Sequence, residues 1–380
     1  MSKWVTVWGN ATSVAERRPE TYARDITLRY PVKCAFAGDR VRLHFSNFCG
    51  AEDISLTRVT IAPAISDREI NLKDAALVTF SGRESVTIKA GEELFSDEID
   101  FRVKPLGKVS VSIYLKDFTL MRSAVVITGP LSKGFYSLGD CTLKSVLPLN
   151  ETRTTETYYF LTGLDLLTDD KNRCVICYGD SITSQSWPDY LAGLCMDDPY
   201  NKTAVVRRAA SGTRVLRQYS CITYESYGLS GKNRFAREIS TVSGADTVII
   251  QQGINDIIHP VGTDVNPFRP MSDLPSADEL KDGLKYYFNI AKEHGLKVIT
   301  GTLLPIKGWR TYAPFREELK NNINVWLRNC GYDCIDFDGA VRSGKDPAAF
   351  DEGCDSGDCL HPSEEGYKRM ARLAFAELNK

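Results

Sequence analysis

A serine, an aspartate and a histidine in this chain have the types and positions that nucleophilic catalysis requires. The run Cys174–Tyr178 is wholly apolar or aromatic, ends abruptly at Gly179-Asp180, and is followed at once by Ser181. A continuous apolar run containing Val and Ile predicts a buried strand of a parallel sheet. The residues that follow such a strand lie at the sheet edge that usually carries the ligand crevice. Ser181 is therefore a candidate nucleophile.

A nucleophilic serine needs a base and an acid that orients the base, and the chain has four histidines to supply the base. His44 falls on the polar positions of a predicted strand, which indicates a surface role. His294 stands at a predicted helix end, where an imidazolium complements the helix dipole. His259 follows a strand end and is a candidate for lining a pocket. His361 lies three residues after Asp358, so a single turn of loop can join them, and this is the most economical acid–base pair.

Hydrogen-bond donors for a developing oxyanion are found after two further predicted strands. Gly253 permits a tight turn, and the side-chain amide of Asn255 can then donate at the same edge as Ser181. Gly212 would let a backbone N–H approach a bound oxygen closely. Because all of these segments adjoin strand ends on one side of the predicted sheet, we expect them to converge.

The hydrophobic pattern divides the chain into two halves. From about residue 25 to 125 apolar residues alternate with polar ones, as at Val41, Leu43 and Phe45, which predicts an antiparallel β-sandwich, jelly-roll-like, over residues 1–150. The stretch 151–171 is expected to be a linker. From residue 172 to 380 buried-type strands alternate with amphipathic helices, which predicts an α/β domain with a flavodoxin-like parallel sheet and helices on both faces.

The elements of the second half can be placed by their apolar runs and capping residues. The predicted strands are Cys174–Tyr178, Ala204–Arg207, Thr247–Gln251, Leu296–Thr302 and Asp333–Phe337. The capping box Ser276-Ala277-Asp278-Glu279 starts one helix, and Pro362 is predicted as the first residue of the last.

The order of these segments resembles that of the SGNH/GDSL hydrolase superfamily over about residues 172–380. The matching blocks are Gly179-Asp180-Ser181, Gly212, Gly253-x-Asn255-Asp256 and Asp358-x-x-His361. The resemblance implies that Ser181 is the nucleophile, His361 the base and Asp358 its orienting acid. It also implies an oxyanion hole made of the Ser181 and Gly212 N–H groups and the Asn255 side chain, and it requires no metal or organic cofactor.

The first half is similar to the N-terminal domain of one group of bacterial GDSL-type esterases. The resembling stretches are Thr27-Leu28-Arg29, Val41-Arg42-Leu43-His44-Phe45-Ser46-Asn47 and Phe95-Ser96-Asp97. The resemblance implies a serine esterase that hydrolyses short-chain acyl esters, with O-acetyl groups on a carbohydrate as the first expectation. A lipase, lysophospholipase or thioesterase is the alternative. Trp187, His259 and Trp309 are candidates for substrate binding, and the loop 257–275 is expected to rim the pocket.

Other classes of protein fit the sequence less well. Ser181 lacks the glycine two residues on that the nucleophile elbow of an α/β-hydrolase requires. The phosphate-loop-like run Gly339–Lys345 is followed by Asp346 instead of the Ser or Thr that binds magnesium. A non-catalytic carbohydrate-binding protein remains the alternative of another class, although the intact serine, histidine, aspartate and asparagine positions oppose it.

Composition restricts the partners and the compartment. The chain has 380 residues, a net charge of −2 and 43% hydrophobic residues, which favours neither nucleic acid nor a membrane as partner. A small-molecule or glycan ester is the expected partner, and the oligomeric state is open. With no apparent signal peptide a cytoplasmic location is expected, with the 11 cysteines reduced. The spacing Cys174-x-x-Cys177 suits zinc, but a strand would turn the two side chains to opposite faces.

Overall fold

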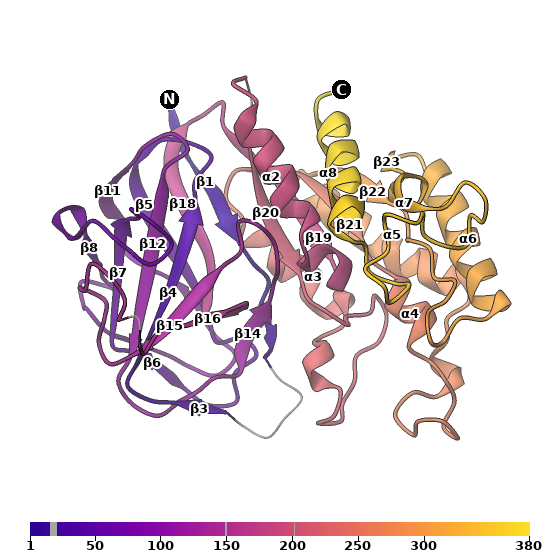
Figure 1. Ribbon diagram of the computed structural model, residues 1–380, viewed down its shortest axis with the longest axis horizontal. Coiled ribbons are helices and arrows are strands. Elements are labelled where there is room, and N and C mark those ends of the chain that lie inside the picture. Colours follow the sequence, from indigo (N-terminus) through magenta and orange to yellow (C-terminus); the bar gives the residue numbers. More distant parts are fainter. Residues whose placement is uncertain (16–20, 149, 201) are drawn as a thin grey trace. The chain divides into compact units, whose positions relative to one another are not determined.

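The computed structural model describes residues 1–15, 21–148, 150–200 and 202–380, which form two compact units (Figure 1). The first unit comprises Met1–Cys174, Asp198–Val206 and Val242–Gly244. The second comprises Val175–Asp197, Arg207–Thr241 and Ala245–Lys380. Two short segments from the second half of the sequence therefore belong to the first unit.

The first unit is built from antiparallel strands, as the alternating pattern predicts. One sheet has the order β16-β15-β4-β12-β7-β8, with bounds Arg153–Thr155, Gly134–Leu138, Ile26–Lys33, Lys108–Leu115, Arg58–Pro63 and Ala76–Val78. The other has the order β1-β18-β5-β10, with β11 also on β5, and bounds Ser2–Gly9, Leu161–Asp169, Gly38–Ser46, Glu93–Phe95 and Ile99–Val103. Shorter strands are β2 (Ser13–Val14), β3 (Tyr22–Ala23), β6 (Ile54–Leu56), β9 (Val86–Ile88), β13 (Thr119–Leu120), β14 (Ser123–Val126) and β17 (Thr157–Tyr159).

The apolar side chains of this unit are buried at the alternating positions. On β5 the side chains of Val41, Leu43 and Phe45 are fully buried, whereas Arg42 between them is partly exposed. Burial of one face of each strand is the driving force for such a sandwich, at about 25 cal/mol per Å² of apolar surface.

The expected linker 151–171 is instead part of the first unit, and this expectation was wrong. It contains β16, β17 and β18, and β18 pairs with both β1 and β5. Its polar residues favour an exposed linker. Asp165 on β18 is nevertheless fully buried, because neighbouring side chains form hydrogen bonds to its carboxylate. Leu164 and Leu166 on the same strand are also fully buried.

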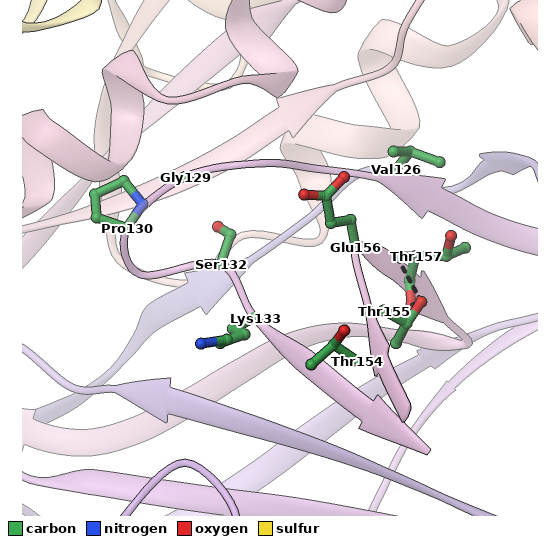
Figure 2. A pocket seen from close by; sticks show the side chains of 9 residues that line it. All are labelled: Val126, Gly129, Pro130, Ser132, Lys133, Thr154, Thr155, Glu156 and Thr157. Carbon is green, nitrogen blue, oxygen red and sulfur yellow. Dashed lines mark hydrogen bonds between the residues drawn. The ribbon is translucent and has the colours of Figure 1, made fainter. Parts of the chain in front are cut away.

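An open polar groove of about 660 Å³ lies in this unit (Figure 2). It is lined by Val126, Gly129, Pro130, Ser132, Lys133, Thr154, Thr155, Glu156 and Thr157. These residues come from β14, the segment that leads to β15, and the strands β16 and β17. The groove thus belongs to the sandwich and not to the unit that contains Ser181.

Most of the predicted parallel sheet lies in the second unit. Its strand order is β20-β19-β21-β22-β23, with bounds Thr203–Ala209, Arg173–Gly179, Ala245–Gln251, Lys297–Gly301 and Asp333–Ile335. This is the flavodoxin-like order 2-1-3-4-5, in which the chain changes direction across the sheet next to the first strand. The prediction of fold class is confirmed. The last strand ends earlier than expected because the Asp336 side chain caps helix α7 at the Gly339 N–H.

Helices cover the sheet on both faces (Figure 1). They are α1 (Ser181–Ser184), α2 (Trp187–Asp197), α3 (Gly231–Ser240), α4 (Ile254–Ile258), α5 (Ala277–Glu293), α6 (Pro314–Asn329), α7 (Phe337–Val341) and α8 (Glu364–Leu378). Helix α2 packs against α8, whereas α5 packs against α3 and α6, which gives two helical layers.

The caps of two helices test the predicted helix starts. Ser276 caps α5 as predicted, since its hydroxyl accepts a hydrogen bond from the Glu279 N–H at 3.2 Å. Pro362 does not begin the last helix, because Ser363 is the N-cap of α8 and accepts from the Gly366 N–H at 3.2 Å. A hydroxyl that satisfies an otherwise unpaired helical N–H defines the start more strongly than the fixed φ of proline.

Candidate active site

The sheet ends bring Ser181 to a sharp turn between β19 and α1. Asp180 is the N-cap of α1, and its carboxylate accepts a hydrogen bond from the Ile182 N–H at 3.1 Å. A side chain at Gly179 would lie 2.4 Å from the Gln251 carbonyl oxygen on the neighbouring strand. Glycine at 179 therefore lets β19 and β21 approach closely just before the serine.

Ser181, His361 and Asp358 form a continuous chain of hydrogen bonds. The Nε2 atom of His361 lies 2.8 Å from the Ser181 Oγ, and its Nδ1 atom lies 2.6 Å from the Asp358 Oδ2. The other oxygen of Asp358 accepts the N–H groups of Leu360 and His361 at 2.9 and 2.8 Å. The structure thus brings together the three residues that the sequence predicts to act together. Ser181 and His361 meet although they are 180 positions apart in the chain.

The environment of Asp358 keeps its carboxylate ionised. Partial burial opposes ionisation, but the hydrogen bonds from the His361 side chain and backbone and from the Leu360 N–H outweigh it and lower the Asp358 pKa. A negative carboxylate at Nδ1 favours the tautomer that leaves the lone pair on Nε2, facing Ser181. The arrangement can therefore accept a proton from the serine hydroxyl.

Gly212 lies in the loop that follows β20, and Asn255 is the second residue of α4, directly after the end of β21. Gly212 has a φ of +76°, and a Cβ atom at this position would lie 2.2 Å from the Tyr227 ring, so only glycine fits. Within the part of the chain that the structure describes, neither the Ser181 nor the Gly212 N–H has a hydrogen-bond partner. Both N–H groups are thus available to a ligand oxygen.

The amide of Asn255 is buried and already makes one hydrogen bond. Its Nδ2 donates to the Thr213 carbonyl at 3.0 Å, which fixes the orientation of the side chain. The second N–H of the same amide remains to face a bound oxygen. Two of the three expected oxyanion donors are therefore backbone groups and the third is held by the loop that carries Gly212.

Two buried carboxyl groups support these loops; the sequence predicts a structural role in the turn for Asp180, whereas it assigns no such role to Asp256. The Asp256 carboxylate accepts the N–H groups of Val215 and Leu216 at 2.7 and 3.0 Å, and burial raises the Asp256 pKa to about 6. Burial likewise raises the pKa of Asp180 to about 7, although the Ile182 N–H and the charge of Arg234 partly oppose the rise. The Asp256 position was visible in the sequence as the residue after Asn255, but its partners come from a distant loop.

Trp187 does not serve the site as expected, and this prediction was wrong. Its side chain is fully buried, its Nε1 donates to the Thr183 hydroxyl at 3.3 Å, and its ring packs on Phe337. The physical reason is its place at the start of α2, one turn after α1, where the helix faces the core. Trp187 stabilises the fold instead of contacting substrate.

His259 and Trp309 occupy different settings. His259 is buried, follows α4 and stacks on the Tyr227 ring at 5.0 Å between centroids, so it contacts the residue that packs on Gly212. Trp309 is partly exposed, and the Arg310 guanidinium lies over its ring. For both residues a role in substrate binding stays a prediction.

Metal-binding groups, cysteines and membrane-spanning helices can be considered for the described residues. They contain no group of three or more His, Cys, Asp or Glu side chains that could hold a metal ion. Cys174 and Cys177 are both buried in β19, and burial raises the pKa of the Cys177 thiol. No helix in the described ranges is long and apolar enough to cross a membrane.

Residues 177–369 match the GDSL-like lipase/acylhydrolase family, and no curated protein matches. A GDSL-like lipase from Bacteroides thetaiotaomicron is similar in structure, with 18% identity, coverage of 56% of this chain and 90% of that chain, and a TM-score of 0.41. An acetylxylan esterase from Geobacillus stearothermophilus is similar with 18% identity, coverage of 56% and 97%, and a TM-score of 0.41. Because the family match spans just over half of the 380 residues, the chain belongs to the GDSL-like lipase/acylhydrolase family of carboxylic ester hydrolases.

Proposed function

We propose that this ester hydrolase works through an acyl-enzyme formed on Ser181. The observation that carries the proposal is the hydrogen-bonded chain Ser181–His361–Asp358, with distances of 2.8 and 2.6 Å. His361 removes the proton from the Ser181 hydroxyl while Oγ attacks the ester carbonyl carbon. Asp358 holds the imidazole in the required tautomer and stabilises the imidazolium that forms.

The carbonyl oxygen becomes an oxyanion at the moment of attack. The N–H groups of Ser181 and Gly212 and the second N–H of the Asn255 amide stabilise that charge. In comparable sites each such donor lowers the barrier by about 3 kcal/mol. The tetrahedral intermediate then breaks its bond to the alcohol oxygen, which takes the proton from His361. Water, deprotonated by the same histidine, attacks the acyl-enzyme and releases the acid and free Ser181.

We propose short-chain acyl esters as the substrates, with O-acetyl groups on a carbohydrate as the first choice. An exposed hydroxyl lies close to the nucleophile segment: the Ser211 hydroxyl lies 3.1 Å from that of the buried Ser184, which in turn donates to the Ser181 carbonyl at 3.2 Å. An exposed hydroxyl near the reacting serine favours a polar, hydroxyl-bearing alcohol over a long alkyl chain. The sequence resemblance to GDSL-type esterases points the same way.

Hydrolysis assays test both parts of the proposal. The p-nitrophenyl esters of acetate, butyrate, octanoate and palmitate are compared first, and acetylated oligosaccharides are then compared by acetate release. We expect the highest kcat/KM for acetate, and a fall of about 10⁴-fold or more in Ser181→Ala because the nucleophile is lost. Ser240→Ala, an exposed serine on α3, is the matched control and should retain full activity.

The possible outcomes test the reaction mechanism and the substrate class independently. Equal background rates in the wild type and in Ser181→Ala would overturn the esterase mechanism for these esters. Activity that depends on Ser181 but rises with chain length would keep the mechanism and replace the acetylated carbohydrate with a lipid ester. Release of thiol from acyl thioesters at a higher kcat/KM would favour a thioesterase.

A further inference from the structure

A buried ion pair on helix α3 contacts segments of the candidate active site. Arg234 and Glu238 are each 2% exposed, and the Arg234 Nη1 lies 2.6 Å from the Glu238 Oε2. The guanidinium also packs over the Tyr178 ring at 4.5 Å. A buried arginine is costly unless its charge and its donors are satisfied. The position of this one therefore requires partners beyond its own helix.

Those partners are the two segments that carry Ser181 and Gly212. The Arg234 Nη2 donates to the Gly179 carbonyl at 2.7 Å and to the Thr213 hydroxyl at 3.3 Å. Gly179 stands two residues before Ser181 at the end of β19, and Thr213 directly follows Gly212. One planar group thus joins the nucleophile turn to the oxyanion loop.

Thr213 extends the connection to the third oxyanion donor. Its hydroxyl accepts a hydrogen bond from the Gln252 side chain at 2.9 Å and donates to the Ala210 carbonyl at 2.8 Å. Its carbonyl accepts from the Asn255 amide at 3.0 Å. The ends of β19, β20 and β21 are therefore tied together through Arg234 and Thr213.

We infer that Arg234 is a positioning residue for the hydrolysis at Ser181: it sets the spacing between the nucleophile and the oxyanion donors by holding the Gly179 carbonyl and the Thr213 hydroxyl with one guanidinium. This inference rests on the proposed function and adds a residue that touches neither substrate nor the reacting atoms. The rigid fork of arginine suits the task, because a lysine ammonium is a flexible point charge and cannot hold the same set of planar contacts.

The consequence for catalysis follows from the geometry that oxyanion stabilisation needs. Donors act when they lie about 2.7–3.1 Å from the oxyanion, and a misplacement of about 1 Å can cost about 100-fold in rate. Loss of the Arg234 contacts frees the turn and the loop to move relative to each other. We therefore expect slower acylation with little change in the binding of substrate in its ground state.

The experiment removes both charges of the pair at once. Arg234→Met alone would leave Glu238 buried with only the 3.5 Å contact to Arg237, so the variant is Arg234→Met/Glu238→Leu, which removes the buried carboxylate and leaves Arg237 with a partly exposed side chain. The acylation rate constant and the dissociation constant of p-nitrophenyl acetate are measured in single turnovers. Inhibition by phenylboronic acid, which forms a tetrahedral adduct on a nucleophilic serine, reports on the oxyanion donors.

We expect the acylation rate constant to fall about 100-fold and the boronate affinity to fall with it, whereas the substrate dissociation constant stays within about twofold. Circular dichroism and the midpoint of urea unfolding are measured to check that the double variant is folded. Lys232→Met, an exposed residue on the same helix, is the control and should match the wild type. A folded double variant with a wild-type acylation rate constant would overturn the inference.

A second pair of variants decides the matter if the double variant does not fold. Thr213→Val keeps the Arg234–Glu238 pair and removes the hydroxyl that contacts Arg234, Gln252 and Ala210, and we expect about a tenfold slower acylation with unchanged substrate binding. Arg234→Lys should lie between this variant and the wild type. Unchanged acylation in both overturns the inference. Absence of any Ser181-dependent acylation in the wild type would instead contradict the proposed function.

Discussion

At the scale of single residues, the candidate site depends on a few groups whose surroundings decide what they can do. Asp358 is partly exposed and ionised, whereas Asp180, immediately before the nucleophile, is fully buried and has a raised pKa. Two carboxyl groups close to one serine thus have different environments and different protonation. Gly212 is required for steric reasons, since its backbone conformation and the nearby ring both exclude a side chain.

Gly212→Ala should impair the reaction more than the fold. An alanine Cβ would meet the Tyr227 ring at 2.2 Å, so the loop must move and displace its N–H from the oxyanion. We expect kcat to fall about 100-fold or more in steady-state assays with p-nitrophenyl acetate. Gly295→Ala is a matched control, because Gly295 has a similar φ of +72° but open space around it. If both variants keep wild-type kcat, the Gly212 N–H does not serve the reaction.

Asp180→Asn should change the pH dependence of stability. Burial raises the pKa of Asp180 to about 7, so the folded protein holds a proton that the unfolded chain releases near pH 4. The unfolding free energy contributed by this group therefore falls as pH rises from about 4 to about 7. We expect the variant to gain stability relative to the wild type across that window, measured by urea unfolding at pH 4.5 and 7.5. Asp282→Asn, which is exposed, should show no such gain, and parallel curves for Asp180→Asn would refute the assignment.

At the scale of elements, strand ends position the groups and helix caps decide where the helices begin. Ser181 is presented by the start of α1 after β19, Asn255 by the start of α4 after β21 and His361 by the segment before α8. Parallel strands place their carboxyl ends at one edge of the sheet, which is why residues distant in sequence meet there. Ser363 and Ser276 each satisfy an N–H at the start of a long helix.

Ser276→Ala should lower stability without changing catalysis. The substitution removes the hydroxyl that accepts the Glu279 N–H at the start of α5, and such losses cost about 1 kcal/mol. The unfolding free energy from urea denaturation measures the effect, and kcat should stay at the wild-type value. Ser276→Asp, which retains an acceptor, is expected to restore stability. A variant with alanine as stable as the wild type would show that the cap contributes nothing.

At the scale of the whole molecule, the division into two units does not follow the sequence order. Segments 198–206 and 242–244 belong to the first unit although they lie among the helices and strands of the second half. Asp165 binds the segment 242–244 through Ser243. Its carboxylate also contacts Thr6, Arg42 and His44. Burial opposes its ionisation, but the hydrogen bond and charge of His44 and the contacts of Thr6 and Arg42 lower the Asp165 pKa.

His44 is thus buried at this cluster, and the prediction of a surface role was wrong. We expect Asp165→Asn to destabilise the protein by about 3 kcal/mol, because Arg42 loses its buried counter-charge and His44 loses the carboxylate that its Nε2 contacts. Chemical denaturation measures the loss. Asp169→Asn on the same strand is exposed and should change the unfolding free energy by less than about 0.5 kcal/mol. Equal stability of both variants would show that the cluster is dispensable.

The sequence by itself was sufficient for the fold class of both halves and for the pairing of Ser181 with His361 and Asp358. These depend on local features: an apolar run that stops at Gly-Asp-Ser, an aspartate three residues before a histidine, and a periodicity that changes from two residues to helical spacing. The tertiary structure alone decided that Trp187 is buried, that β18 is a strand of the sandwich, and that Arg234 contacts the loops around the serine. The reason is physical: whether a side chain is buried, and which donor meets which acceptor, depends on segments that are brought together only when the chain packs.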